Sequence, residues 1–312
     1  MGQTNDLEAA AQALREGKLV AFPTETVYGL GADATNDAAV ARVYQAKGRP
    51  SFNPLITHVA DLAAAEALGV FTEDARKLAQ AFWPGPLSLV VPRRKDCPVS
   101  LLASAGLDSI ALRIPSHPMA LDFLKAAGKP VVAPSANPSG KISPTSAEHV
   151  RKHLKDKVAA ILDGGRCKVG VESSVVSFLD GATLLLRHGG IPRAEIERVL
   201  GHPVAVEQHS ARPHAPGQLL SHYAPHAELR LNADAPREGE AYLGFGRLHA
   251  HGPYTLSATG DLVEAAASLF RLLHEIDATG VARIAVAPIP HHGLGDAIND
   301  RLMRAAAPRD SA

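Results

Sequence analysis

The sequence contains 312 residues, of which 46% are hydrophobic and 21% charged, and its 32 Lys and Arg balance 32 Asp and Glu. This composition is ordinary for a soluble globular protein, and no apolar run approaches the ~18 residues of a membrane span, which argues against a membrane protein. The N-terminal stretch has the pattern of an amphipathic helix rather than of a signal peptide. Cys97 and Cys167 fit neither a disulfide framework nor a zinc site. We therefore expect a cytoplasmic protein.

Charge is distributed unevenly along the chain. Residues 1–200 hold 23 Lys and Arg against 20 Asp and Glu, whereas the remaining 112 residues hold 9 against 12. The excess of positive charge in the first part is too small to argue for nucleic-acid binding by itself. After about residue 201 the composition turns to His, Pro, Gly and Ser, as in linkers. We predict a first domain over residues 7–200, a linker or lid over 201–226 and a smaller domain over 227–312.

Apolar periodicity and turn residues predict a mixture of helices and strands. In the first domain, helices are expected at the N-terminus and over 38–46, 61–68, 73–82, 118–127, 147–154 and 193–200, and strands over 19–22, 56–59, 109–114, 131–133, 159–162, 174–178 and 183–187. Residues 83–91 are expected to form a turn that leads into a β-rich run. In the last domain, strands are expected over 241–244 and 283–286, and helices over 261–276 and 296–306. Strands and helices do not alternate strictly, which favours an α/β domain with a twisted mixed sheet over a doubly wound fold. No glycine-rich dinucleotide or P-loop motif follows a strand.

Four predicted loops at strand ends carry polar residues: TETVYG (24–29), KGRPSFN (47–53), APSANPSG (133–140) and GVESS (170–174). Arg113 and Arg187 stand inside otherwise apolar strands. Taken singly, each has an ordinary explanation, such as a strand-end arginine reaching water or a turn built from Ser, Asn, Pro and Gly. Taken together they indicate a ligand site, because loops at the ends of strands commonly build one.

The residue types in these loops indicate anion binding and positioning. Lys and Arg compensate phosphate or carboxylate charge, while small hydroxyls and amides orient a ligand. No nucleophile motif and no paired carboxylates occur. Such a site is typical of nucleotidyl or phosphoryl transfer, which depends on charge compensation and positioning.

The segments KGRP…FNPL, ALRIP, APSAN.SG..SPT, GVESSVV and LLRHGGI resemble, in order and spacing, the YrdC-type threonylcarbamoyl-AMP synthases. Two later segments, LSATGDLVEAAASLFRLLHEID and GLGDAINDRLMRAA, resemble the C-terminal domain of the long, two-domain members. The resemblance implies a YrdC-like twisted mixed sheet with a central cavity, followed by a smaller Rossmann-like α/β domain.

The resemblance also implies a reaction. L-threonine, bicarbonate or CO2, and ATP give threonylcarbamoyl-AMP and pyrophosphate, and a downstream transfer complex uses the product to modify tRNA next to the anticodon. Mg²⁺ is expected to bind through the ATP phosphates rather than in a protein metal site, with no organic prosthetic group. Weak tRNA binding is a further expectation.

Site residues follow from the resemblance position by position. The threonine site would comprise Thr26, His58, Arg113, Ala133 and Ser173. The ATP site would comprise Lys47, Arg49, Asn53, Ser109, Ser135, Asn137, Ser143, Arg187 and Tyr223, with Lys47 and Arg49 as the catalytic cations. The chain departs from the family before HYAP, where Leu219, Leu220 and Ser221 replace the usual basic and aromatic residues.

Two other functions remain as alternatives. A basic cavity could bind double-stranded RNA or tRNA without catalysis, although the chain has no RNP-type aromatic strand and only 4% aromatic residues. A carbamoyl-transfer domain of the hydrogenase-maturation type would need zinc-finger cysteines, and two lone cysteines do not supply them.

Overall fold

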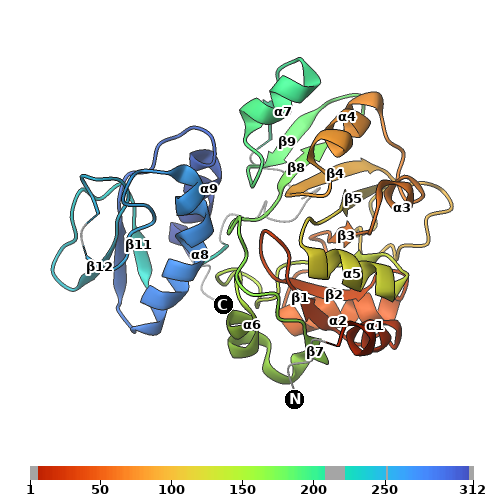
Figure 1. Ribbon diagram of the computed structural model, residues 1–312, viewed down its shortest axis with the longest axis horizontal. Coiled ribbons are helices and arrows are strands. Elements are labelled where there is room, and N and C mark those ends of the chain that lie inside the picture. The colour runs from red at the N-terminus through yellow and green to blue at the C-terminus, as the bar shows by residue number, and fades with distance from the viewer. Residues whose placement is uncertain (1–5, 208–221, 251, 309–312) are drawn as a thin grey trace.

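Two β-sheets organise the chain (Figure 1). A computed structural model describes residues 6–207, 222–250 and 252–308. The residues up to 207 build the N-terminal domain around the larger sheet, and the residues from 222 onward lead into the C-terminal domain around the smaller one. Within these residues, no helix combines the length and the apolar character that crossing a membrane requires.

The larger sheet is mixed, as the sequence predicts. Its strand order is β10-β9-β8-β4-β5-β3-β6-β2-β1-β7, with β3 parallel and β4 antiparallel to β5. The strands are β1 (Val20–Phe22), β2 (Gly29–Asp33), β3 (Ile56–His58), β4 (Leu87–Pro92), β5 (Ser109–Arg113), β6 (Val131–Val132), β7 (Ala160–Ile161), β8 (Ser174–Ser177), β9 (Leu184–Arg187) and β10 (Ala205–Val206).

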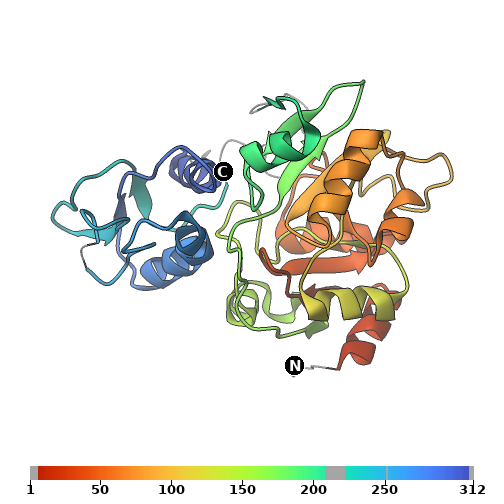
Figure 2. The same ribbon diagram turned by 45° about the horizontal axis from the view of Figure 1, so that its top comes forward.

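Helices surround this sheet (Figures 1 and 2). They are α1 (Leu7–Arg15), α2 (Asp37–Lys47), α3 (Leu62–Glu66), α4 (Glu73–Phe82), α5 (Pro118–Ala127), α6 (Ala147–Leu154) with the 3₁₀ turn Lys155–Lys157, and α7 (Arg193–Leu200). Helix α2 begins after Asn36, whose side chain accepts the Ala39 N–H at 3.1 Å, and ends at Gly48 in the left-handed region. This glycine stop turns the chain sharply, so that Lys47 is the last helical residue and the polar loop starts directly after it.

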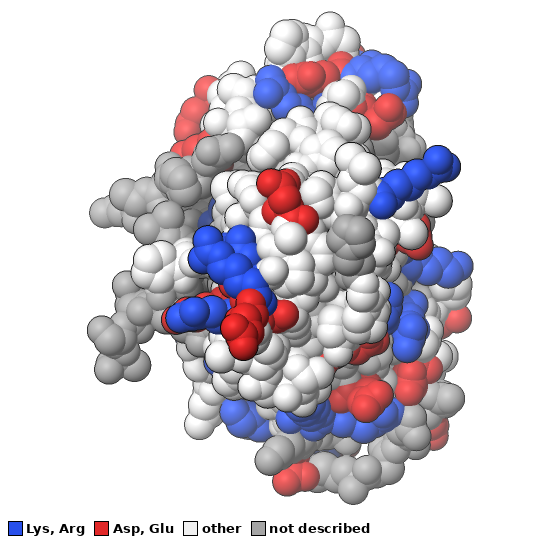
Figure 3. Space-filling model, turned by 90° about the vertical axis from the view of Figure 1, so that its left-hand side faces the viewer, with Lys and Arg blue, Asp and Glu red and all other residues white. Residues whose placement is uncertain are grey.

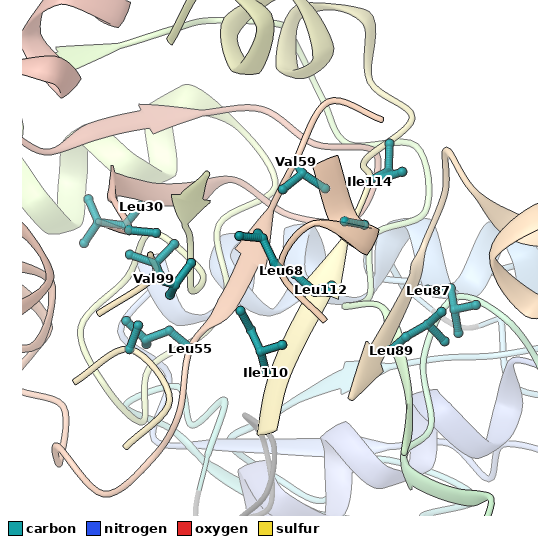
Figure 4. Packing of buried hydrophobic residues seen from close by; sticks show 14 of the residues in the cluster. Leu30, Leu55, Val59, Leu68, Leu87, Leu89, Val99, Ile110, Leu112 and Ile114 are labelled. Atoms are coloured by element: carbon teal, nitrogen blue, oxygen red, sulfur yellow. The ribbon is translucent and has the colours of Figure 1, made fainter. Parts of the chain in front are cut away.

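Apolar side chains from several strands and loops form the main core of the N-terminal domain. Figure 4 shows Leu55 and Val99 beside Ile110 and Leu112 of β5. Complete burial of one such aliphatic side chain stabilises the fold by about 1.5–3 kcal/mol. This packing gives the polar strand ends a rigid support.

The C-terminal domain is a parallel sheet with order β11-β13-β12, built from β11 (Glu228–Arg230), β12 (Glu240–Leu243) and β13 (Arg283–Val286). Helices α8 (Leu262–Ala278) and α9 (Gly295–Ala306) lie between this sheet and the N-terminal domain (Figures 1 and 2). The opposite side of the domain presents a broad surface of uncharged residues, with charges of both signs scattered around it (Figure 3).

The two domains share one hydrophobic cluster. Val27, Ile142 and Val171 of the N-terminal domain belong to the cluster that contains Leu269 and Phe270 of α8. The backbones of the two domains approach each other at Gly170, where a Cβ atom would lie 2.4 Å from the carbonyl oxygen of Ala266. Glycine is therefore required at this position, which also has a positive φ.

The sequence missed three strands. The first is β2, where no strand was expected, although it is fully buried between β1 and β6. Glycine is rare inside strands, so Gly29 and Gly31 argued against a strand here. In the structure Gly31 is needed because a Cβ atom at this position would lie 3.0 Å from the Phe22 ring. Strands β10 and β11 are short and half-exposed, so they lack an apolar signature. Leu219, Leu220 and Ser221 lie outside the described residues.

Candidate active site

The four polar loops meet at one cavity. Its wall consists of Val27, Arg49, Ile56, His58, Arg113, Ala133, Pro134, Ser135, Glu172, Ser173, Arg187, His222 and Tyr223. Its volume is about 40 Å³. Three arginines face one glutamate in this wall, so the cavity has the charge of an anion-binding site.

Arg113 ends strand β5 and is anchored by a carboxylate. Its Nη2 donates to Oε1 of Glu25 at 2.7 Å and to the Thr26 hydroxyl at 2.9 Å. The other carboxylate oxygen of Glu25 accepts the N–H of Ser116 at 3.0 Å. These contacts hold the guanidinium in one orientation and offset the unfavourable free energy of burying its charge.

His58 lies beside Arg113 because β3 and β5 are parallel neighbours in which these two residues are paired. Burial lowers the pKa of His58 to about 3, and the charge of Arg113 adds to this effect. The imidazole is therefore neutral at physiological pH. Its Nδ1 lies 3.3 Å from the Ile56 carbonyl oxygen, and the neutral ring adds no charge to the site.

Arg187 and Ser173, which both line the cavity, are joined by hydrogen bonds. Nε and Nη2 of Arg187 donate to the Ser173 carbonyl at 3.0 and 2.9 Å, and Nη2 also donates to its hydroxyl at 3.0 Å. The Ser173 hydroxyl is 2.8 Å from that of Ser88. The predicted threonine and nucleotide halves of the site therefore touch at Ser173.

Lys47 holds the turn formed by Ser135, Ala136 and Asn137, called the SAN turn below. Its Nζ donates to the carbonyl of Ser135 at 2.5 Å and to that of Asn137, and the Lys47 carbonyl accepts the N–H of Ser139 at 2.7 Å. Burial, together with the nearby charge of Arg49, lowers the pKa of Lys47 well below its ordinary value. The contacts link the end of α2 rigidly to the loop after β6.

Arg49 is held by its own loop, where Nε donates to the Asn53 carbonyl at 3.2 Å and Nη2 to the Pro54 carbonyl at 3.0 Å. Both polar atoms of the Asn53 side chain are buried without a partner among the described residues, as is Oδ1 of Asn137. Buried amides without partners are costly, so these atoms are candidates for contact with a ligand, an ion or an ordered water.

The structure brings most of the predicted residues to the cavity wall, but not all. Arg49, His58, Arg113, Ala133, Ser135, Ser173, Arg187 and Tyr223 form part of the wall. Thr26, Lys47, Asn53, Asn137 and Ser143 stand behind it or beside it. Ser109 lies at the start of β5 and lines a separate small cavity together with Thr57.

Sequence reasoning missed two buried carboxylates, Glu25 and Glu172. Oε1 of Glu172 accepts the Ser143 hydroxyl at 2.5 Å, and Oε2 accepts Nε of Arg301 at 2.8 Å. Burial would raise the pKa of Glu172, but Arg301, Arg187 and the Ser143 hydrogen bond outweigh it and lower that pKa. The signal was available for Glu25, because Arg113 inside an apolar strand requires a carboxylate partner. Arg301, the partner of Glu172, lies in a helix of the other domain.

Comparison with known proteins identifies the family. One family model, described as telomere recombination, matches residues 12–189, and a second, the C-terminal domain of threonylcarbamoyl-AMP synthase, matches residues 191–307. The chain belongs to the threonylcarbamoyl-AMP synthase family.

Its similarity to two-domain members of this family extends over nearly the whole length. The threonylcarbamoyl-AMP synthases of Pyrococcus abyssi and Bacillus subtilis are each 42% identical to it, over 97% and 98% of this chain and 94% and 95% of theirs. The crystal structure of P. abyssi Sua5 complexed with L-threonine superposes with a TM-score of 0.88 at 40% identity, covering 96% of this chain and 94% of that one. The long two-domain form and the YrdC-like fold expected from the sequence are confirmed.

Proposed function

We propose that this protein is an L-threonylcarbamoyladenylate synthase, which forms threonylcarbamoyl-AMP and pyrophosphate from L-threonine, bicarbonate or CO2, and ATP. The observation that carries the proposal is a cavity whose wall, among the described residues, contains Arg49, Arg113 and Arg187 and one carboxylate, Glu172. A threonine carboxylate and a nucleotide phosphate are both anions whose charge arginines compensate.

In the proposed reaction, threonine and bicarbonate first condense to N-carboxylated threonine with loss of water. A carbamate oxygen then attacks the α-phosphorus of ATP, and the bond to the bridging oxygen breaks, so that pyrophosphate leaves with the electron pair. Arg113, aligned by Glu25, would hold the threonine carboxylate. Lys47 and Arg49 would stabilise the charge that develops on the leaving pyrophosphate, which is where fixed cations accelerate a reaction most.

Mg²⁺ on the ATP phosphates is part of this proposal. The amide oxygens of Asn53 and Asn137 are buried without partners among the described residues, and oxygen atoms are the ligands that Mg²⁺ prefers. These two residues would contact the ion or its waters, and the ion would neutralise phosphate charge.

We further propose that the protein acts in the cytoplasm and supplies a downstream complex that modifies tRNA, with weak tRNA binding of its own. RNA binding as the main function is less favoured. The face of the C-terminal domain seen in Figure 3 has no concentration of Lys and Arg of the kind that tracks an RNA backbone.

The proposal is tested by incubating the protein with ATP, L-threonine, bicarbonate and Mg²⁺. We expect pyrophosphate release that requires all three substrates, together with a threonylcarbamoyl-AMP product of the expected mass. Pyrophosphate formed at the same rate without threonine or bicarbonate would contradict it.

A further inference from the structure

Helix α9 of the C-terminal domain inserts one side chain, that of Arg301, into the N-terminal domain. The side chain is 0% exposed. Its Nε donates to Oε2 of Glu172 at 2.8 Å, and its Nη1 donates to the His188 carbonyl at 2.9 Å and to Oδ2 of Asp300 at 2.7 Å. Two of these three partners belong to the loops that line or flank the cavity.

Glu172 connects Arg301 to Ser143, a residue of the predicted ATP site. Because the two oxygens of Glu172 accept from Arg301 and from the Ser143 hydroxyl, the carboxylate links the two residues in one chain of hydrogen bonds. Burial by itself would lower the pKa of Arg301, but Tyr223, Glu172 and Asp300 outweigh it and raise that pKa. The guanidinium therefore stays charged.

Arg301 also holds Tyr223, a wall residue of the cavity. Its guanidinium carbon lies 5.2 Å from the centre of the Tyr223 ring, and the ring of Phe270 in α8 stacks on Tyr223 at 5.5 Å. The backbone of Tyr223 has a φ of 66°, which a bulky residue rarely adopts. Such a conformation costs about 1–3 kcal/mol and persists only where its surroundings impose it.

The neighbouring residue is fixed by the same helix. The N–H of His222 donates to the carbonyl of Arg304 at 3.2 Å, so α9 holds both His222 and Tyr223 against the cavity. On the other side, the N–H of Ala224 donates to the Gly140 carbonyl at 2.8 Å in the loop that carries the SAN turn. The wall formed by residues 222–223 is thus positioned by contacts from both domains.

We propose that Arg301 is a positioning residue of the synthase, through which the C-terminal domain completes the nucleotide half of the active site. It does so by aligning Glu172, and with it Ser143, and by fixing the Tyr223 ring. This inference rests on the proposed function. It assigns to the C-terminal domain an indirect part in ATP binding, through the residues that Arg301 positions.

The experiment compares Arg301→Met with Arg301→Lys and with the double variant Arg301→Met/Glu172→Gln. Arg301→Met alone leaves the buried charge of Glu172 without its partner, which destabilises the protein, and the second substitution removes that charge. Arg283→Met is the matched control, because Arg283 is an exposed arginine of the same domain whose side chain is 67% accessible. Steady-state pyrophosphate release gives KM for ATP and for threonine, calorimetry gives threonine affinity without ATP, and thermal unfolding gives stability.

We expect KM for ATP to rise roughly 10- to 100-fold in Arg301→Met, the loss typical of a charged hydrogen bond, while threonine affinity stays at the parent value. In the double variant the melting temperature should return toward that of the parent while KM for ATP stays high, and Arg301→Lys should lie between the two. If KM for ATP returns to the parent value together with the melting temperature, or if ATP and threonine are weakened equally, the inference is overturned. Failure of the proposed function is seen separately, as absence of three-substrate pyrophosphate release in the parent chain.

Discussion

Glu25 and Arg113 form a buried ion pair, with Nη2 of the arginine 2.7 Å from Oε1 of the glutamate and both side chains less than a tenth exposed. The pair joins the loop after β1 to the end of β5. Because Glu25 also accepts the N–H of Ser116, the position of the carboxylate is fixed independently of the arginine. The arginine is therefore oriented before any ligand arrives.

The first prediction concerns this arginine. Arg113→Ala alone should destabilise the protein by about 3–5 kcal/mol, because it leaves a buried carboxylate unpaired, so the informative variant is Arg113→Ala/Glu25→Gln. We expect KM for threonine to rise by about 100-fold, the loss of one charged hydrogen bond, with little change in KM for ATP. Steady-state kinetics with each substrate varied in turn checks this. Equal increases in both KM values would contradict the assignment.

The second prediction concerns Lys47 and Arg49, the two cations proposed to stabilise the leaving pyrophosphate and called the phosphate clamp here. Lys47→Ala and Arg49→Ala should each reduce kcat for pyrophosphate release by about 10²–10³, the usual effect of removing one fixed group that stabilises transition-state charge. Lys125→Ala is the matched control, since Lys125 is an exposed lysine in the last turn of α5, as Lys47 is in the last turn of α2. Circular dichroism tests whether the variants fold, and a folded variant with parental turnover would refute the clamp.

The third prediction separates stability from function at Asn53. Asn53→Ala removes a buried amide that has no partner among the described residues, so the melting temperature should stay unchanged or rise. KM for ATP should increase by about tenfold, the value of one lost hydrogen bond. Thr57→Val is the control, because it removes a buried hydroxyl that, like the Asn53 amide, has no partner among the described residues. It should leave KM for ATP unchanged. A parental KM in Asn53→Ala would show that the amide contacts neither the nucleotide nor its metal ion.

The fourth prediction concerns three histidines between the domains. The rings of His149 and His153 in α6 lie 3.9 and 5.3 Å from that of His274 in α8. Burial lowers the pKa of His149 to about 4 and that of His274 to about 3, and neighbouring positive charges add to the effect. Unfolding restores a pKa near 6.5, so the unfolded chain binds more protons below that pH and stability falls as the pH drops from about 6.5 toward 4.

Urea denaturation at pH 7.5 and pH 5 measures this loss. In His274→Gln the amide can still donate to the Ser143 carbonyl, which Nε2 of His274 contacts at 3.1 Å, but one titrating group is removed. The decrease in unfolding free energy between the two pH values should therefore be smaller than in the parent. An identical decrease in both proteins would exclude His274 as a contributor.

Local signals in the sequence predicted most elements of both domains. Helix α4 begins at the Thr72 cap and α2 ends at Gly48, and such caps depend on neighbouring residues only. The loops with site residues were recognisable for the same reason, since polar and turn-forming residues interrupt apolar strands. Strand β2 escaped detection because its glycines suit a close approach to Phe22, which is a tertiary contact.

The amino-acid sequence by itself determined the family, the mixed α/β class and the loops that carry the cations. These features depend on residues that are close together in the sequence, as short motifs or as the periodic pattern of one helix or strand. Only the tertiary structure decided which carboxylate serves which cation. Arg113 bonds Glu25, 88 positions away, and Arg301 bonds Glu172, 129 positions away. A buried charge must find a partner, but which partner lies within 3 Å depends on how the strands and the two domains pack.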